Sequence, residues 1–491
     1  MTILLVVLVA LATLFMAGLR VPRRQDGWGV SLRWALAACA VGAILVANMA
    51  LYKHDTHFDL TREQAFTPAE ETLAVVRALD RDVDLVYFYQ QQSPAGLAAK
   101  SMVELLGRTS PRLRVQTVDP DRNPGIANRL GVKLYNAAVL RSGGEQIEVI
   151  TTEDREIALG IQRLLRKDRR AVCVLAGHGE YDIDNFEFHT HFEGRHSHSH
   201  DVQGMAVVQM EQHGAGRLRR SLEKLGYAVR KVTLAVESAV PENCGCLVAM
   251  NPRTRFGPPE VEALEAWLRR GGSLLMLVEP DYPVDGQLAA LLARAGVKVG
   301  DGVVTDPTSH YYTDEQMIAI TAYADHPATR RLALSFFPGA RPVMPVAAPG
   351  VTAKALFSSS ASSMLLPAGQ HHAERARPGT SPAEPRPLAV ASQGALDPAQ
   401  GAKTFRLIVV GDADFASNSF FPYLSNADLA LGTIAWLRGE ERGASVKPPV
   451  ETLPTVVLTN RQMQAIFLIC VLLLPGLVMV AGAAAWWLRR R

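Results

Sequence analysis

The sequence lacks the signatures of the common enzyme classes and any strong net charge. It contains no G-x-S-x-G elbow, no H-E-x-x-H pair and no G-x-x-x-x-G-K-[ST] phosphate loop. The missing phosphate loop excludes an ATPase, and no standard catalytic motif takes its place. A net charge of only +3 over 491 residues provides no general field for nucleic acid, so we expect no nucleic-acid partner.

Cysteine is also scarce, because five cysteines in a chain of this length do not make a disulfide scaffold. Cys39 and Cys470 fall in strongly apolar runs and Cys173 in a short apolar stretch, which leaves Cys244 and Cys246 as a C-x-C pair. A disulfide closed directly within C-x-C is strained. The pair is therefore expected to be two free thiols or a weak metal pair.

Three long segments contain no Asp, Glu, Lys, Arg or His: residues 2–19, 34–51 and 465–488. Each can cross about 30 Å of hydrocarbon as a helix. The first has no basic residue before it and no small-residue cleavage pattern after it, so we expect an anchor rather than a signal peptide. Because the segments offer no ionisable relay, the chain is not expected to be a transporter by itself.

Arginine placement predicts the orientation of these helices. Arginines lie between the first two segments, within residues 1–52, and the chain ends in Arg489, Arg490 and Arg491, so both places are expected in the cytoplasm. The region between them would then lie in the periplasm of a bacterium, joined by a linker (446–462) to a C-terminal helix and cytoplasmic tail (463–491). The inverted topology stays open, since long domains can be translocated regardless of charge.

Residues 53–168 are predicted to form a small α/β unit. The pattern gives a helix with Thr67 as N-cap and Pro68 in its first turn, strands at 83–89 and 113–120 with a helix at 95–110, a hairpin turning on Gly143 and Gly144, and a helix at 152–166. This order resembles a thioredoxin-like domain. The redox family would carry C-x-x-C where residues 90–94 are QQQSP, so we expect a binding or spacer module without dithiol chemistry.

Residues 169–445 are predicted to form a larger α/β domain with a mostly parallel sheet. Short apolar runs alternate with helical segments, which is typical of strands buried on both faces. The strands are expected at 171–177, 227–234, 246–252, 273–280 and 405–415, and the helices near 216–226, 261–270 and 426–441. Asn426 is expected to cap the last helix, and Trp267 to belong to the core. Residues 338–403, rich in Pro, Ala and Ser, are expected to form a mobile or disordered insertion with one short strand at 387–392.

Polar residues follow four of the predicted strands. Parallel α/β sheets bind ligands outside the carboxyl ends of their strands, so these residues are the candidate ligand-binding set: His178, Glu180, Asn251, Glu279, Asp412 and Asp414. The alternative is that such residues only end strands and cap the next turn or helix. A second hypothesis is a metal-dependent hydrolase that uses His178, Glu180 and Asp412.

A histidine-rich loop, residues 185–204, follows the first of these turns. Its candidate metal ligands are His189, His191, His196, His198 and His200. Imidazoles at H-x-H spacing can bind Zn²⁺, Cu²⁺ or Ni²⁺, although such a loop binds weakly unless it is preorganised. This gives a third hypothesis, a periplasmic metal-buffering or sensing protein. Adventitious metal binding, or a polar loop without a metal, is the alternative.

Four stretches together resemble a known family: GHGE after an apolar strand, VDPDRNPGIANRLGV, VVGDADFASNSFF and NADLALGTIAWLRGEE. They are similar to the GldG-type auxiliary proteins of ABC transporters, which are associated with gliding motility and with uncharacterised ABC-type transport systems. The resemblance implies an inner-membrane subunit that recognises a ligand or partner and works with a separate ABC permease and a cytoplasmic ATPase. It carries over no catalytic residue and no cofactor. The first membrane segment, the histidine-rich loop and the Pro/Ser-rich segment depart from the family pattern.

Overall fold

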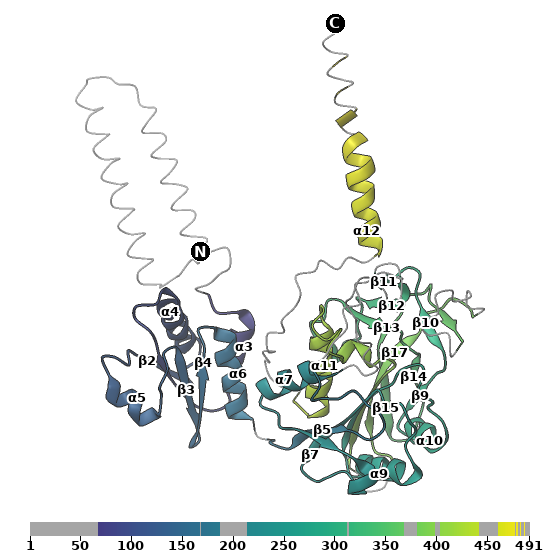
Figure 1. The fold of residues 1–491 in the computed structure, drawn as a ribbon, viewed down its shortest axis with the longest axis horizontal. Helices are drawn as coiled ribbons and strands as arrows, with labels where there is room; N and C mark the ends of the chain where they lie inside the picture. The colour runs from purple at the N-terminus through teal and green to yellow at the C-terminus, as the bar shows by residue number, and fades with distance from the viewer. Residues whose placement is uncertain are drawn as a thin grey trace, which may run out of the picture. The chain divides into compact units, whose positions relative to one another are not determined.

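The computed structural model of the chain describes residues 67–166, 168–186, 214–311, 314–367, 381–397 and 403–440, with most of 460–479 and residues 482 and 486. The predicted spans 2–19 and 34–51 lie outside these residues. The chain divides into two compact units, 1–67 and 68–491, so the parts described below belong almost entirely to the second unit (Figure 1).

The first α/β part confirms the predicted order of strand, helix, strand and hairpin. Its elements are α3 (Glu70–Arg77), β1 (Val83–Phe88), α4 (Pro94–Thr109), β2 (Leu113–Val118), α5 (Pro124–Leu130), β3 (Ala137–Ser142), β4 (Glu145–Ile150) and α6 (Asp154–Leu165). The sheet order is β2-β1-β3-β4, with β1 parallel to β2 and antiparallel to β3. Gly143 and Gly144 form the hairpin turn with φ values of 58° and 88°, a backbone conformation that glycine adopts without strain.

Two local predictions in this part need correction. Helix α3 begins at Glu70 rather than at Pro68, and its N-cap is Ala69 instead of Thr67. The N–H of Ala69 donates to Oδ2 of Asp154 (2.7 Å), so a carboxylate of α6 accepts a hydrogen bond from the backbone at the start of α3. The short helix α5 was not predicted.

The larger part is built on a seven-stranded mixed sheet with the order β15-β17-β18-β8-β7-β5-β6. Its strands are β5 (Ala171–Leu175), β6 (Val229–Val232), β7 (Cys244–Met250), β8 (Ser273–Leu277), β15 (Val351–Ser358), β17 (Pro387–Gly394) and β18 (Phe405–Val410). The five strands from β18 to β6 are parallel, and β15 and β17 add antiparallel strands at one side. The predicted mostly parallel sheet is confirmed, and it continues into this antiparallel edge.

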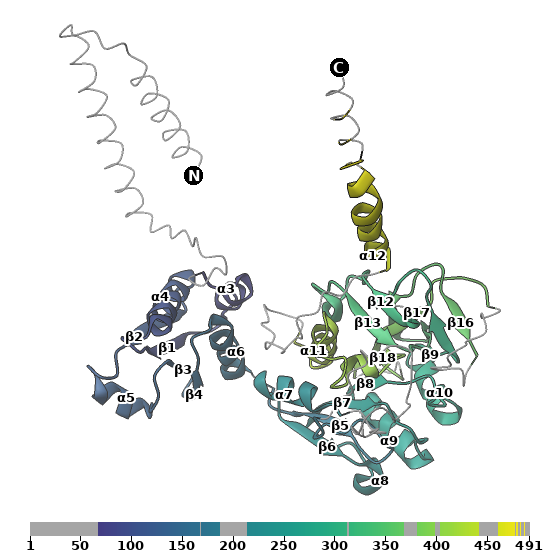
Figure 2. The same cartoon turned by 45° about the horizontal axis from the view of Figure 1, so that its top comes forward.

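Helices cover both faces of this sheet (Figures 1 and 2). They are α7 (Gly216–Lys224) and α11 (Asn426–Leu437) on one face and α9 (Pro258–Arg269) and α10 (Gly286–Arg294) on the other, with the short helix α8 (Leu234–Glu237) beside β6. Strands β5, β7 and β8 are buried along their whole length, which is why they consist of continuous apolar runs. Trp267 of α9 is a core residue as predicted, and its Nε1–H donates to the carbonyl oxygen of Ser273 (3.0 Å).

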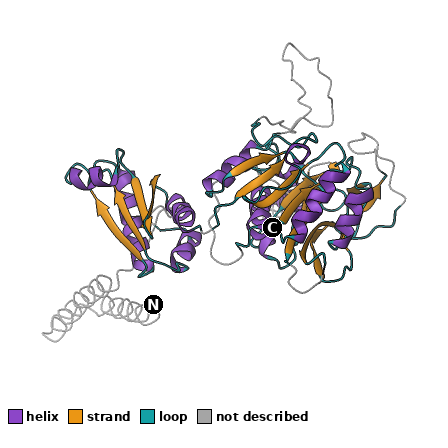
Figure 3. Cartoon of the chain, turned by 90° about the horizontal axis from the view of Figure 1, so that it is seen from below, coloured by secondary structure: helices purple, strands orange, loops and turns teal. Residues whose placement is uncertain are grey.

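The segment after α10 carries short strands and turns. They are β9 (Val297–Val299), β10 (Val303–Thr305), β11 (His310–Tyr311), β12 (Asp314–Ile320), η1 (Pro327–Thr329), β13 (Ser335–Pro338), β14 (Val343–Pro345), β16 (Met364–Leu366) and η2 (Asp414–Ala416). They pair as β10 with β16, β14 with β9, and β11-β12-β13. Figure 3 distinguishes the strands, in orange, from the helices that cover them.

The prediction of a mobile or disordered insertion at 338–403 is wrong for its described residues, although its predicted strand at 387–392 is present as β17. Most of 338–367 and 381–397 is ordered, and β15 and β17 pair within the main sheet. The serine-rich stretch is held by buried Asp306, whose two carboxylate oxygens accept hydrogen bonds from the hydroxyl and the N–H of Ser360 (2.7 Å each). A composition typical of loops is ordered here because its hydroxyls and amides have fixed partners.

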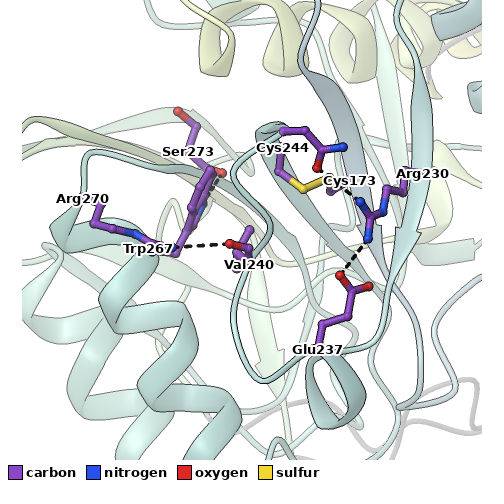
Figure 4. Close-up of a disulfide and its surroundings, with 9 residues drawn as sticks. Cys173, Arg230, Glu237, Val240, Cys244, Trp267, Arg270 and Ser273 are labelled. Atoms are coloured by element: carbon purple, nitrogen blue, oxygen red, sulfur yellow. Dashed lines mark hydrogen bonds and ion pairs between the residues drawn. A yellow bond between two sulfur atoms is a disulfide. The ribbon is translucent and has the colours of Figure 1, made fainter.

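The cysteine prediction fails for Cys244, which forms a disulfide with Cys173 on the neighbouring strand (Figure 4). Their Cα atoms are 5.6 Å apart. The pairing of β5 with β7 contains a register shift at this point. Cys244 therefore lies on the face of the sheet that α9 covers, and Cys246 lies on the face that α11 covers. Cys246 remains a free thiol, and burial raises its pKa to about 12.

Helix α11 and the C-terminal segment complete the description. The N-cap of α11 is Ser425; Asn426 is buried instead and joins the helix to β13 through the N–H and C=O of Phe336. Helix α12 (Asn460–Phe467) continues into a π-helical turn, Leu468–Leu473, just before Pro475, where a wider turn avoids the usual clash of the proline ring. The predicted span 465–488 is only partly described. No helix among the described residues has the length and apolarity needed to cross a membrane.

Candidate functional site

Four parallel strands, β5, β7, β8 and β18, end at the same edge of the sheet. The turns that follow them carry all six predicted ligand-binding residues: His178, Glu180, Asn251, Glu279, Asp412 and Asp414. The contacts among these residues form two groups, one around His178 and one around Glu279. Whether either group binds a ligand stays a prediction.

His178 lies between two carboxylates. Its ring Nε2 is 3.0 Å from Oε2 of Glu260, and its Nδ1 is 3.6 Å from Oε1 of Glu180. The backbone N–H of His178 donates to Oε2 of Glu180 (2.6 Å), and the ring packs against Phe256 with centroids 4.5 Å apart. All three polar side chains are largely buried. The turn after β5 is therefore a formed structure rather than an open chain.

Glu260 was missed by the sequence analysis. It is the third residue of α9, and its Oε2 also accepts the N–H of Gly257 (2.7 Å). This is the carboxylate half of a capping box, so the spacing from Gly257 to Glu260 at a predicted helix start was the available signal. The same carboxylate oxygen thus caps the start of α9 and orients His178.

The second group consists of buried acids at the ends of β8 and β18. Oε1 of Glu279 accepts the N–H groups of Ala413 (2.5 Å) and Asp414 (3.2 Å), while Oδ1 of Asp412 accepts the N–H of Phe415 (2.8 Å). The hydroxyl of Tyr181, a residue that no sequence pattern indicated, donates to Oδ1 of Asp414. These acids hold the turn after β18 in place.

The electrostatics of this group follow from burial. Burial, with the charges of Asp414 and Asp412, raises the pKa of Glu279 well above its ordinary value. Burial and the charge of Asp414 likewise raise the pKa of Asp412. Tyr181, also buried and facing Asp414, has a raised pKa and stays a hydrogen-bond donor; its hydroxyl also interacts with the Asn251 side chain. Asn251 has a φ of 53°, an uncommon conformation outside glycine that asparagine tolerates better than most residues.

The hydrolase hypothesis needs His178, Glu180 and Asp412 around one metal. The contacts of His178 go to Glu180 and Glu260, whereas Asp412 holds the N–H of Phe415. Within the described part of the chain, no three His, Cys, Asp or Glu side chains are arranged to hold a metal ion. The hypothesis gains no support from these contacts.

A small hollow of about 160 Å³ lies beside the first group. It is lined by residues of the loops after β7 and β8, including Phe256 and Tyr282. Arg255 and Asp285 also line it and form an ion pair (2.8 Å). The hollow therefore offers both aromatic side chains and an ion pair at the candidate edge.

The candidate metal ligands His189, His191, His196, His198 and His200 lie outside the described residues, in the segment 187–213. The chain on either side of that segment is well held. The N–H of Ala215 donates to the carbonyl oxygen of Asp182 (2.9 Å), and the N–H of Gly216 donates to that of Asn185 (2.9 Å). The two ends of the described chain that flank residues 187–213 therefore lie together.

Because these ends meet, we expect a short Gly/Ser linker to replace residues 187–213 without unfolding the domain. Loop-closure entropy changes slowly with length, so the melting temperature should stay within about 4 °C of the wild-type value. Thermal unfolding measures this, and titration of both proteins with Zn²⁺ and Cu²⁺ shows whether metal binding resides in the segment. Unchanged metal affinity in the shortened protein would contradict the histidine-rich loop as a metal site.

Comparisons with known proteins place the larger α/β part in a family context. The family model described as ABC-type uncharacterized transport system matches residues 169–441. A search of curated proteins found no match. The mmIFT52 N-terminal domain is a similar solved structure, at 16% identity over 55% of this chain and 97% of that chain, with a TM-score of 0.38.

Two further structures show low similarity. The thioredoxin of Fasciola hepatica is 20% identical over 17% of this chain and 81% of its own, with a TM-score of 0.16. The exo-beta-1,4-mannosidase Op5Man5 from Opitutaceae bacterium strain TAV5 is 14% identical over 69% of this chain and 48% of its own, with a TM-score of 0.27. These values do not assign a function.

Proposed function

We propose that this chain, which belongs to the ABC-type uncharacterized transport system family, is a membrane-anchored extracytoplasmic subunit of GldG type. It would work beside an ABC permease and a cytoplasmic ATPase in a bacterial inner membrane. The family match covers residues 169–441, which is the part that holds the candidate edge. The family match also supports the expected association with transporter components.

Its proposed role is recognition rather than catalysis. The observation that carries this proposal is the use of the edge side chains: Glu279 and Asp412 hold backbone N–H groups, and His178 is held between Glu180 and Glu260. Buried polar side chains engaged in this way hold the turns at this edge rigid, and these turns would present the surface to a ligand or partner. The rigid turns favour specific binding, because a preformed surface loses less conformational entropy when it is occupied.

Two observations support the proposed placement outside the cytoplasm. The Cys173–Cys244 disulfide suits an oxidising compartment, since structural disulfides are rare in the cytosol. The three apolar segments of the sequence would anchor the chain, with the large soluble region in the periplasm and the C-terminus in the cytoplasm. The inferred thioredoxin-like unit, with QQQSP at residues 90–94, would serve as a partner-binding module.

The test is affinity purification of the full-length protein in mild detergent, with mass spectrometry of the chains that purify with it and metal analysis of the same sample. We expect a permease and an ATPase at near-stoichiometric amounts, absent from a mock purification without the tagged chain. A lone protein that carries about one transition metal per chain would overturn the proposal in favour of metal binding.

A further inference from the structure

The turn after β18, residues 411–421, lies between the buried acids and the chain that flanks residues 187–213. On one side, Glu279 and Asp412 hold its N–H groups at Ala413, Asp414 and Phe415. On the other side, Asn418 holds the chain that borders residues 187–213. Movement of this turn would therefore change its contacts with the buried acids and with the chain that flanks residues 187–213.

Asn418 contacts the chain on both sides of that segment. Its Nδ2 donates to the carbonyl oxygen of Asn185 (2.7 Å), and its backbone N–H donates to that of Gly214 (2.8 Å). Its Oδ1 accepts the N–H of Arg217 at the start of α7 (2.9 Å). Asn418 is fully buried, so these hydrogen bonds are shielded from water.

Two carboxylate oxygens of Glu279 and Asp412 accept no hydrogen bond from the described residues. Oε2 of Glu279 and Oδ2 of Asp412 are buried and have no hydrogen-bond partner among the residues that the structure describes. Leaving a buried ionised oxygen without a donor is costly, and a bound proton removes that cost. The side chains of Glu279 and Asp412 are thus suited to hold protons.

None of the described groups that face these two acids donates a hydrogen bond to Oε2 of Glu279 or Oδ2 of Asp412. Tyr181, following β5, donates its hydroxyl to Asp414, and Asp414 adds negative charge. Arg341, following β13, is a buried cation whose charge attracts that of Glu279, but its Nη1 donates to the carbonyl oxygen of Glu279 (3.0 Å) rather than to the carboxylate. Protons on Glu279 and Asp412 therefore relieve the repulsion among the three acids.

We propose that Glu279 and Asp412 form a proton-operated latch that keeps the turn 411–421 closed while the pair is protonated. When both acids ionise, their repulsion and that of Asp414 loosen the turn and release the contacts of Asn418 with Asn185 and Gly214. The latch deepens the proposed function by adding pH control to the same edge. It rests on that function only for its role in the cell.

The direction of the pH effect follows from the raised pKa values of Glu279 and Asp412. A carboxyl group whose pKa is higher in the closed than in the open state binds its proton more tightly when closed. The bound proton stabilises the closed state fully when the pH is below the pKa of the open state. This stabilisation is lost as the pH rises through the pKa of the closed state. The turn should open on the alkaline side.

Hydrogen exchange of the full-length protein in detergent between pH 5.5 and 8.5 tests the latch. After correction for intrinsic exchange, we expect protection of the amides in 411–421 and 214–217 to fall by about tenfold or more across this range. Asp412→Asn and, separately, Glu279→Gln should each weaken or remove this dependence. Asp301→Asn, which changes an exposed carboxylate, should leave it intact, and β8 amides serve as the internal reference.

Protection in the turn that does not change with pH in the wild-type protein would overturn the latch. So would an undiminished dependence in whichever of the two variants folds. These measurements need no partner, so they are independent of the co-purification result. A latch without a recovered permease would reject the proposed function alone, and a recovered permease without a pH effect would reject the latch alone.

Discussion

Replacing Cys173 and Cys244 together by alanine is expected to lower the free energy of unfolding by about 4 kcal/mol. The disulfide joins residues separated by 71 positions, so it removes much conformational freedom from the unfolded chain. Both side chains are fully buried, and their loss also leaves small cavities beside β5 and β7. Thermal unfolding of the full-length protein in detergent should show a fall of about 10 °C for the larger α/β part.

Cys246→Ala is the matched control. Cys246 is equally buried, lies on β7 two residues from Cys244 and forms no cross-link, so its replacement should cost far less. A reductant should lower the melting temperature of the wild-type protein and of Cys246→Ala, but not of the double variant. Equal melting temperatures for oxidised and reduced wild-type protein would contradict a stabilising role for the disulfide.

The main sheet could be predicted because its strands are buried on both faces. Such strands need apolar residues at every position, and the runs that form β5, β7, β8 and β18 meet that need without long-range information. Their parallel arrangement in turn brings the polar turns after them to one edge. The positions of His178 and Glu279 could be inferred in this way, although their binding role stays a prediction.

The remaining features depend on which strands are neighbours. Cys173 and Cys244 could be paired only by knowing that β5 lies beside β7. Likewise, Asp306 and Ser360 meet across 54 residues, and this contact orders a stretch whose composition suggested disorder. Local sequence patterns do not indicate such long-range contacts.

The site shows the same limit. Glu260 reaches His178 across 82 residues. Arg341, inside the supposed insertion, lies against the turn after β8. Glu260 at least had a local signal in its capping position, whereas Arg341 had none. A buried arginine surrounded by proline and alanine in the sequence gives no sign of its partners.

Arg341→Met is expected to be the second most damaging change, costing about 3 kcal/mol or more. The guanidinium is buried and donates to the carbonyl oxygens of Gly300 (2.9 Å), Glu279 (3.0 Å) and Tyr282 (2.5 Å). Methionine fills much of the volume but donates no hydrogen bond, so these buried acceptors lose their partner. The fall in melting temperature should come with faster hydrogen exchange in residues 279–286, the loop that Arg341 holds.

Asp301→Asn separates this effect from the loss of an ion pair. Nη2 of Arg341 lies 3.2 Å from Oδ1 of Asp301, whose side chain is 91% exposed. An ion pair with such an exposed partner contributes at most about 1 kcal/mol, so Asp301→Asn should be nearly neutral. If Asp301→Asn were as damaging as Arg341→Met, charge pairing rather than the three carbonyl contacts would hold the loop. If Asp301→Asn is neutral and Arg341→Met is damaging, Arg341 holds the edge by donating hydrogen bonds to backbone oxygens. A lysine could not fully replace it, because a single ammonium group lacks the planar, forked arrangement of donors of the guanidinium.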